Sequence, residues 1–148
     1  MILGTPERPM HAVRTYQQQR AVGWTRIDLL LTLFDRAVSE LEGALAAREA
    51  GGAEAARPGL LRFQGLLSGL VAGVNPEGGE LAANFLRLYE FAFHCASQGK
   101  PEDLRAALTV LRTLREGLVE IRPEARRLER EGVVPPPPDL AASVLHEV

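Results

Sequence analysis

The stretch Gly78-Gly79-Glu80-Leu81-Ala82-Ala83-Asn84-Phe85-Leu86-Arg87-Leu88-Tyr89-Glu90-Phe91 opens with a glycine turn and continues as a helix that is apolar on two sides. Two lines of apolar residues with helical spacing run along it, Leu81, Phe85, Leu88 and Ala92, and beside them Ala82, Leu86, Tyr89 and Phe93. A helix that packs on one side only needs one such stripe. This helix is therefore expected either to sit in the middle of a bundle or to offer one stripe to a partner.

Three further segments have the apolar spacing of helices, and no segment has the alternation of a strand. The expected helices cover residues 26–49, 60–74, 80–97 and 102–121, and Thr25 is the expected N-cap of the first. Glycine and proline separate them, with Pro58 in a loop before the second helix and Pro123 ending or kinking the fourth. Four helices with mostly short connections predict an all-α fold, an up-down antiparallel four-helix bundle.

The two ends of the chain differ in composition from the middle. Residues 1–11 lack periodicity and are expected to be disordered, and residues 12–23, with Tyr16, are expected to form an N-terminal strap on the bundle. We expect the bundle domain to span residues 12–122. The Pro-rich C-terminal tail, 123–148, contains a run of four prolines that favours polyproline II, followed by a short helix over 140–148.

Composition excludes several classes of protein. The formal net charge of -2 does not suggest a nucleic-acid binder, which is usually basic. The single cysteine, Cys95, excludes an intrachain disulfide framework and fits a reducing compartment. The N-terminus lacks the pattern of a signal peptide, and no apolar run has the roughly 20 residues that span a bilayer. We therefore expect a cytoplasmic protein that does not insert into membranes.

Catalytic and cofactor motifs are not found in the sequence. The histidines, His11, His94 and His146, form no ligand cluster. Glu90 and His94 lie one turn apart, but a metal site in a bundle needs further Glu-x-x-His pairs. The sequence also lacks a P-loop, GxGxxG and GxSxG. We expect neither an enzyme nor a cofactor.

Three segments resemble the FliS family, the flagellin export chaperones. The segment Gly78-Gly79-Glu80-Leu81-Ala82-x-Asn84-x-x-x-Leu88-Tyr89 is similar to the third-helix signature of that family. Tyr16-Gln17-Gln18-Gln19, followed by Leu29 and Leu33-Phe34-Asp35, resembles its opening, and Leu114-Arg115-Glu116 resembles the end of its fourth helix. The resemblance covers residues 12–122.

The chain departs from the family pattern at a few positions. Thr25-Arg26 replaces the usual Ser/Thr-Pro pair, Arg36 and Trp24 replace small residues, Phe34 replaces a tyrosine, and Leu118 replaces an aromatic residue. The tail 123–148 has no counterpart. These departures leave the expected fold unchanged. They affect which partner the protein binds and the details of the surface that binds it.

The resemblance implies a chaperone that binds the disordered C-terminal segment of flagellin, prevents its premature polymerisation and delivers it to the flagellar export apparatus. The sequence leaves open whether the protein contacts the export gate. The alternative is a helical-bundle adaptor or secretion chaperone for a different client. Co-expression with flagellin discriminates between the two, because only a flagellin chaperone forms a complex that needs the flagellin C-terminus.

A chaperone for an amphipathic segment needs an apolar groove in which a helix can lie. The helices over 26–49 and 80–97 carry more apolar surface than one stripe requires. The predicted partner-binding residues are Tyr16, Leu30, Leu33, Phe34, Leu86, Tyr89 and Phe93. The competing interpretation is that the six helical residues are ordinary core. The strap with Tyr16 and the segment 140–148 are candidate covers for the empty groove.

Overall fold

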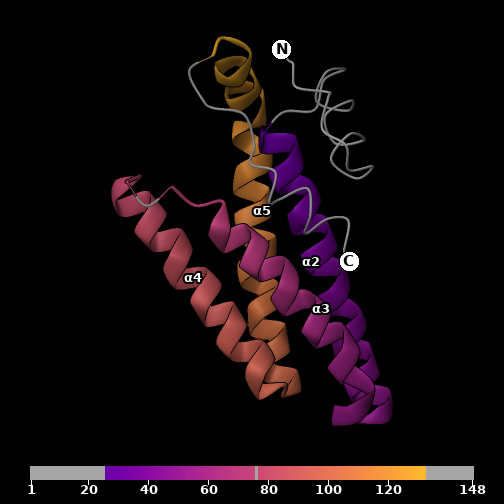
Figure 1. The fold of residues 1–148 in the computed structure, drawn as a ribbon. Coiled ribbons are helices and arrows are strands. Elements are labelled where there is room, and N and C mark those ends of the chain that lie inside the picture. The colour runs from indigo at the N-terminus through magenta and orange to yellow at the C-terminus, as the bar shows by residue number, and fades with distance from the viewer. Residues whose placement is uncertain (1–25, 76, 133–148) are drawn as a thin grey trace, which may run out of the picture.

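The computed structural model describes residues 26–75 and 77–132, and these residues form four helices and no strand. The helices are α2 (Arg26–Gly51), α3 (Ala53–Ala72), α4 (Gly79–Gln98) and α5 (Pro101–Arg130). Successive helices run in opposite directions (Figure 1). The predicted all-α, up-down four-helix bundle is confirmed. The predicted N-cap Thr25, the strap with Tyr16 and the end of the tail lie outside the described residues.

Each helix packs against two others. The α2 helix contacts α3 and α5, and α4 contacts α3 and α5. The largest fully buried side chains come from all four helices: Phe34, Leu41, Phe63, Leu66, Leu67, Leu70, Tyr89, Leu104 and Leu111. Burying each of them stabilises the fold by roughly 1.5–3 kcal/mol. The first half of α2 is buried around more than one stripe because α3 covers one side of it and α5 another.

The α4 helix is buried unevenly along its length. Its buried residues, Tyr89, Ala92, Cys95 and Ala96, all lie in its second half. In its first half, Leu81 is 69% exposed although it continues the line of Phe85 and Leu88. The fully buried positions of α4 therefore lie in its second half, whereas in its first half Phe85 packs on the core and Leu81 leaves apolar surface uncovered.

The turns before and after α4 are formed by residues that favour turns and helix ends. The amide N–H of Glu77 donates to Asn75 Oδ1 at 3.0 Å, which closes the turn before the helix. Gly99 ends α4 in the left-handed conformation, with φ 71°, and Pro101 begins α5. This is the arrangement in which glycine ends a helix and proline starts one.

Pro58, which was expected in a loop, and Pro123, which was expected to end or kink a helix, both lie inside helices. The α3 helix begins at Ala53, earlier than the predicted start near residue 60, and includes Pro58. A proline inside a helix removes one hydrogen bond and costs about 3 kcal/mol. Packing offsets this cost, because Ala56 is buried and Gly59 lies so close to α2 that a Cβ on it would be 3.4 Å from Ala44 Cβ.

Pro123 likewise does not end α5, which continues to Arg130. The expected boundary between residues 122 and 123 therefore falls within one helix. Arg122 Nε donates to Asp28 Oδ1 at 2.6 Å and Ala125 packs on the core, so contacts with α2 hold the chain helical on both sides of the proline. Gly132, with φ 79°, follows the helix end. No helix within 26–75 and 77–132 is long and apolar enough to cross a bilayer.

Candidate functional site

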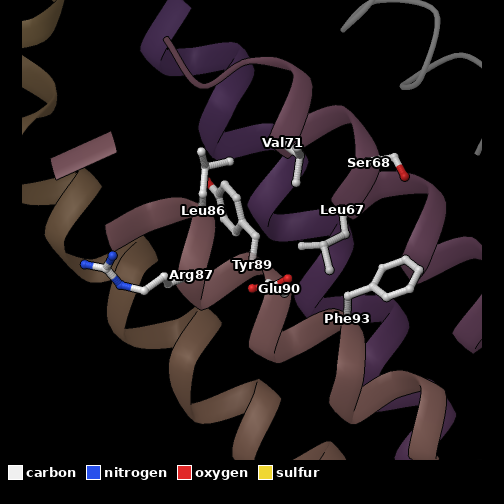
Figure 2. Close-up of a pocket in the computed structure, with 8 residues that line it drawn as sticks. All are labelled: Leu67, Ser68, Val71, Leu86, Arg87, Tyr89, Glu90 and Phe93. Carbon is white, nitrogen blue, oxygen red and sulfur yellow. The ribbon is translucent and has the colours of Figure 1, made fainter. Parts of the chain in front are cut away.

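A groove of about 510 Å³ lies between α3 and α4. Its walls come from Leu67, Ser68 and Val71 of α3 and from Leu86, Arg87, Tyr89, Glu90 and Phe93 of α4. Figure 2 shows the side chains of Leu86, Tyr89, Leu67 and Phe93 gathered between the two helices, with Val71 and Ser68 on the α3 side. Both sets follow helical spacing, so each helix presents one continuous edge to the groove.

Large apolar side chains at the groove are open to solvent. Leu86 is 37%, Val71 42% and Phe93 43% exposed, and all three belong to the same hollow. Single exposed apolar residues are common on protein surfaces, but a contiguous apolar hollow marks a binding surface. The apolar face of an amphipathic helix is the kind of partner that such a groove accepts.

Tyr89 forms the floor of the groove and connects it to the core. Its side chain is buried, and its ring centroid lies 6.2 Å from that of Phe34 and 5.9 Å from that of Phe85. The contact with Phe85 is edge to face, the geometry that aromatic quadrupoles favour. Burial raises the pKa of the Tyr89 hydroxyl well above its usual range. Tyr89 therefore supports the groove from beneath as a buried aromatic ring.

The charged residues of the groove lie on α4. Arg87 Nη2 donates to Asn84 Oδ1 one turn earlier on the same helix, and Glu90 lies between Leu86 and Phe93 in the helical row. Both charged residues are exposed. One cation and one anion leave the groove close to neutral, so apolar contact dominates what it can bind.

The structure brings together three of the seven predicted partner-binding residues. Leu86, Tyr89 and Phe93 line the groove. Leu33 and Phe34 are buried in the core at 3% and 0% exposure, where a partner does not reach them. Leu30 is half-buried against the core, and Tyr16 lies outside the described residues. Phe34 acts on the groove only through its contact with Tyr89.

Sequence reasoning missed the α3 wall of the groove. The apolar residues of the helix expected over 60–74 form one core stripe that includes Leu67, and the sequence predicts no groove role for Leu67, Ser68 or Val71. Val71 lies off that stripe, and an apolar residue off the core stripe of an otherwise amphipathic helix was the available signal. For Asp35 the sequence leaves both a solvated charge and a pair with an arginine open, and the structure pairs it with Arg115 of α5 while its side chain stays 54% exposed.

The described residues contain no group of three or more His, Cys, Asp or Glu side chains that could hold a metal ion. Cys95 is buried, and burial, followed by the charge of Asp103, raises the pKa of its thiol. A raised pKa makes the thiol a poor nucleophile at neutral pH, which is typical of a packed cysteine.

Comparison with known proteins agrees with this architecture. The family model described as "Flagellar protein FliS" matches residues 9–125. No match to the chain was found among curated proteins or among solved structures. The matched region contains α2, α3, α4 and most of α5, and therefore both walls of the groove. The chain belongs to the FliS family, whose members are flagellar export chaperones.

Proposed function

We propose that this protein is the export chaperone of flagellin and that it holds the C-terminal segment of flagellin in the groove between α3 and α4. In this role it acts in the cytoplasm, keeps flagellin from polymerising and delivers it to the export apparatus. The role is one of binding rather than catalysis. The proposal also assigns the predicted residues Leu86 and Phe93 to direct contact with the client, and Tyr89 to the buried support beneath them.

The observation that carries the proposal is the exposed apolar groove in a chain of this family. Leu86, Val71 and Phe93 remain 37–43% exposed at one hollow. Covering a fully exposed large apolar side chain contributes roughly 1.5–3 kcal/mol. Three anchors that are 37–43% exposed therefore supply only part of the roughly 8 kcal/mol of a micromolar interaction, and other contacts with the client supply the rest. A disordered segment that folds on binding loses part of this gain as ordering entropy.

The test is a calorimetric titration, in which flagellin from the cell that makes this protein is added to the full-length chaperone. Val71→Glu introduces a charge into the groove and is expected to weaken binding at least about tenfold. Val119→Glu is the matched control, because Val119 is also a helical valine, 43% exposed, and lies outside the groove. The control is expected to bind as the wild type does.

Deletion of the flagellin C-terminus is expected to abolish the complex. If flagellin does not associate, or associates equally well without its C-terminus, the proposal fails and the bundle serves a different client. Equal affinity of Val71→Glu and Val119→Glu would remove the α3–α4 groove from the binding site.

A further inference from the structure

The side of α5 that faces α4 is open to solvent over the last third of the helix. Burial, followed by the charge of Asp103, raises the pKa of the Cys95 thiol, so Asp103 lies on the side of α5 next to α4. Ile121 follows Asp103 on α5 after five full turns of 3.6 residues and therefore points to the same side. Ile121 is nevertheless 53% exposed, so α4 does not cover this side along its whole length.

The α4 helix leaves this side open because it diverges from α5. The two helices lie close together at the Cys95 end of α4 and separate towards its start, and the end of α5 stands beyond α4 (Figure 1). Leu81 lies four turns before Cys95 on the same side of α4 and is 69% exposed. The α5 helix also has 30 residues and α4 only 20, so α5 is longer by about 15 Å.

The open side of α5 carries an apolar stripe. Leu114, Ile121 and Leu128 follow one another in steps of two helical turns and share one face, which we call the α5 stripe. Leu114 packs on the core, whereas Ile121 is mostly exposed. The neighbouring side of α5 belongs to α2, because Arg122 Nε donates to Asp28 Oδ1 there. The α2 helix therefore cannot also cover Ile121.

The end of α5 directs the chain back towards this stripe. Gly132 has the left-handed φ of 79°, and its N–H donates to the carbonyl oxygen of Glu129 at 3.1 Å. This hydrogen bond is one of the two that define the Schellman motif. In that motif the residue after the glycine commonly contacts the third-last residue of the helix. Here these two residues are Val133 and Leu128, the last member of the stripe.

We infer that residues 140–148 of this chain bind the α5 stripe as a short amphipathic helix. The sequence places Leu140, Val144, Leu145 and Val148 on one side of such a helix. A helix this short is marginal alone and needs a surface on which to pack. The segment lies outside the described residues, and both it and Leu128 follow residue 125, where the match to the family ends. The inference does not rest on the proposed function.

The linker has the length that this contact needs. From Gly132 back to Ile121 is about 16 Å along α5. Residues 133–139 include the four prolines 135–138, and a polyproline II segment of this length spans about 22 Å. The segment therefore reaches Ile121 without any change in α5. A tethered segment also meets the stripe at an effective concentration in the millimolar range, which favours it over a second copy of the chain.

The test is photo-cross-linking of the full-length protein without a client. A photoreactive phenylalanine analogue replaces Ile121 in one variant and Val119 in a matched control. Val119 is also an exposed residue of α5, at 43%, but two positions along a helix it points to nearly the opposite side. The Ile121 variant is expected to capture residues 140–148 within a monomer, whereas the Val119 variant should not capture them.

Each other result overturns the inference and names a different occupant. A dimeric product from the Ile121 variant means that a second copy covers the stripe. Capture of residues 1–25 means that the N-terminal segment does so. A third variant carries the analogue at Val71, and capture of residues 140–148 there but not at Ile121 means that the tail covers the groove between α3 and α4 instead. Absence of capture at Ile121, or equal capture at Val119, means that the tail has no specific site on α5.

Thermal unfolding of paired variants gives an independent measurement. Ile121→Glu and Leu145→Glu are each expected to lower the thermal midpoint by about 2–5 °C, because each introduces a charge into the same apolar contact. Once one has disrupted the contact the other has little left to remove, so the double variant should unfold close to the single ones. Val119→Glu combined with Leu145→Glu is the control and should give the sum of the two separate effects. Additive effects of Ile121→Glu and Leu145→Glu would contradict the inference.

Discussion

Glu129, close to the end of α5, caps the first turn of α2 at Arg26. Glu129 Oε1 accepts a hydrogen bond from the backbone N–H of Arg26 at 2.6 Å, and Oε2 accepts one from Ile27 at 3.0 Å. The guanidinium of Arg26 donates in turn to the carbonyl oxygen of Gly73, just after α3, at 3.2 Å. One carboxylate and one arginine thus join the ends of three helices at the same end of the bundle.

Glu129→Ala is expected to lower the free energy of unfolding by about 1–2 kcal/mol. The first N–H groups of a helix have no partner within the helix, and a carboxylate there also interacts favourably with the helix dipole. Urea denaturation followed by circular dichroism measures the change. Glu120→Ala, at an exposed position of the same helix, is the control and should change stability little. Equal losses in the two variants would contradict a capping role for Glu129.

The structure separates two phenylalanines that the sequence placed in one site. Phe34→Ala is expected to cost about 3–5 kcal/mol of stability, because the ring is fully buried beside Tyr89. Phe93→Ala should leave the thermal midpoint nearly unchanged and weaken flagellin binding, because its ring is 43% exposed in the groove. Thermal unfolding and calorimetry distinguish the two. A stable Phe34→Ala protein with weakened binding would instead place Phe34 in direct contact with the client.

The helices could be predicted from the sequence because apolar spacing and glycine breaks are local signals. Glycine and proline were expected to separate the helices over 80–97 and 102–121, and in the structure Gly99 ends α4 and Pro101 begins α5. The effects of Pro58 and Pro123 could not be predicted in the same way. Whether a proline ends a helix depends on the tertiary contacts that offset its cost, here Gly59 against α2 and Arg122 with Asp28.

The groove could be predicted only in part for a related reason. A second apolar stripe shows that a helix has surplus apolar surface, but the sequence does not show which neighbour covers it. In α2 the surplus is buried by other helices, so Leu33 and Phe34 are core. In α4 the surplus stays open at Leu86 and Phe93, because these two side chains line the groove beside α3 and no other helix covers them.

The four acidic residues that face α5 recur every seven residues along α2, and each pairs with an arginine: Asp28 with Arg122, Asp35 with Arg115, Glu42 with Arg112, and Glu49 with Arg105. Asp35→Asn is expected to cost less than about 1 kcal/mol, because the Asp35 side chain is 54% exposed and solvent screens the pair. Asp28→Asn should cost more, roughly 1–3 kcal/mol.

The Asp28 side chain is only 16% exposed and also lies 3.7 Å from Arg126, whose buried Nε has no hydrogen-bond partner among the described residues. Removing its charge leaves a partly buried guanidinium uncompensated. Urea denaturation at low and high salt measures both variants. High salt should reduce the effect of Asp35→Asn more than that of Asp28→Asn. If Asp28→Asn and Asp35→Asn lose the same stability and depend on salt in the same way, the Asp28 pair is no stronger than the Asp35 pair.

Tyr89 makes the stability of the protein depend on alkaline pH. Burial raises the pKa of its hydroxyl in the folded state, whereas in the unfolded chain the hydroxyl loses its proton near its usual pKa of about 10. Above about pH 10 the unfolded state therefore binds fewer protons than the folded state, and the free energy of unfolding falls as the pH rises. Below that pH both states keep the proton, and Tyr89 contributes no pH dependence.

The variant Tyr89→Phe keeps the ring and removes the ionisable group, so its stability should fall less than that of the wild type between about pH 8 and pH 11. Urea denaturation at the two pH values measures the difference. Cys95 contributes to the pH dependence of stability that remains in Tyr89→Phe, because the pKa of its thiol is raised too. Cys95→Ala in the Tyr89→Phe background should therefore reduce this pH dependence further. If wild type and Tyr89→Phe lose the same stability over this range, the Tyr89 hydroxyl is not held neutral by the fold, and the groove floor is open to solvent.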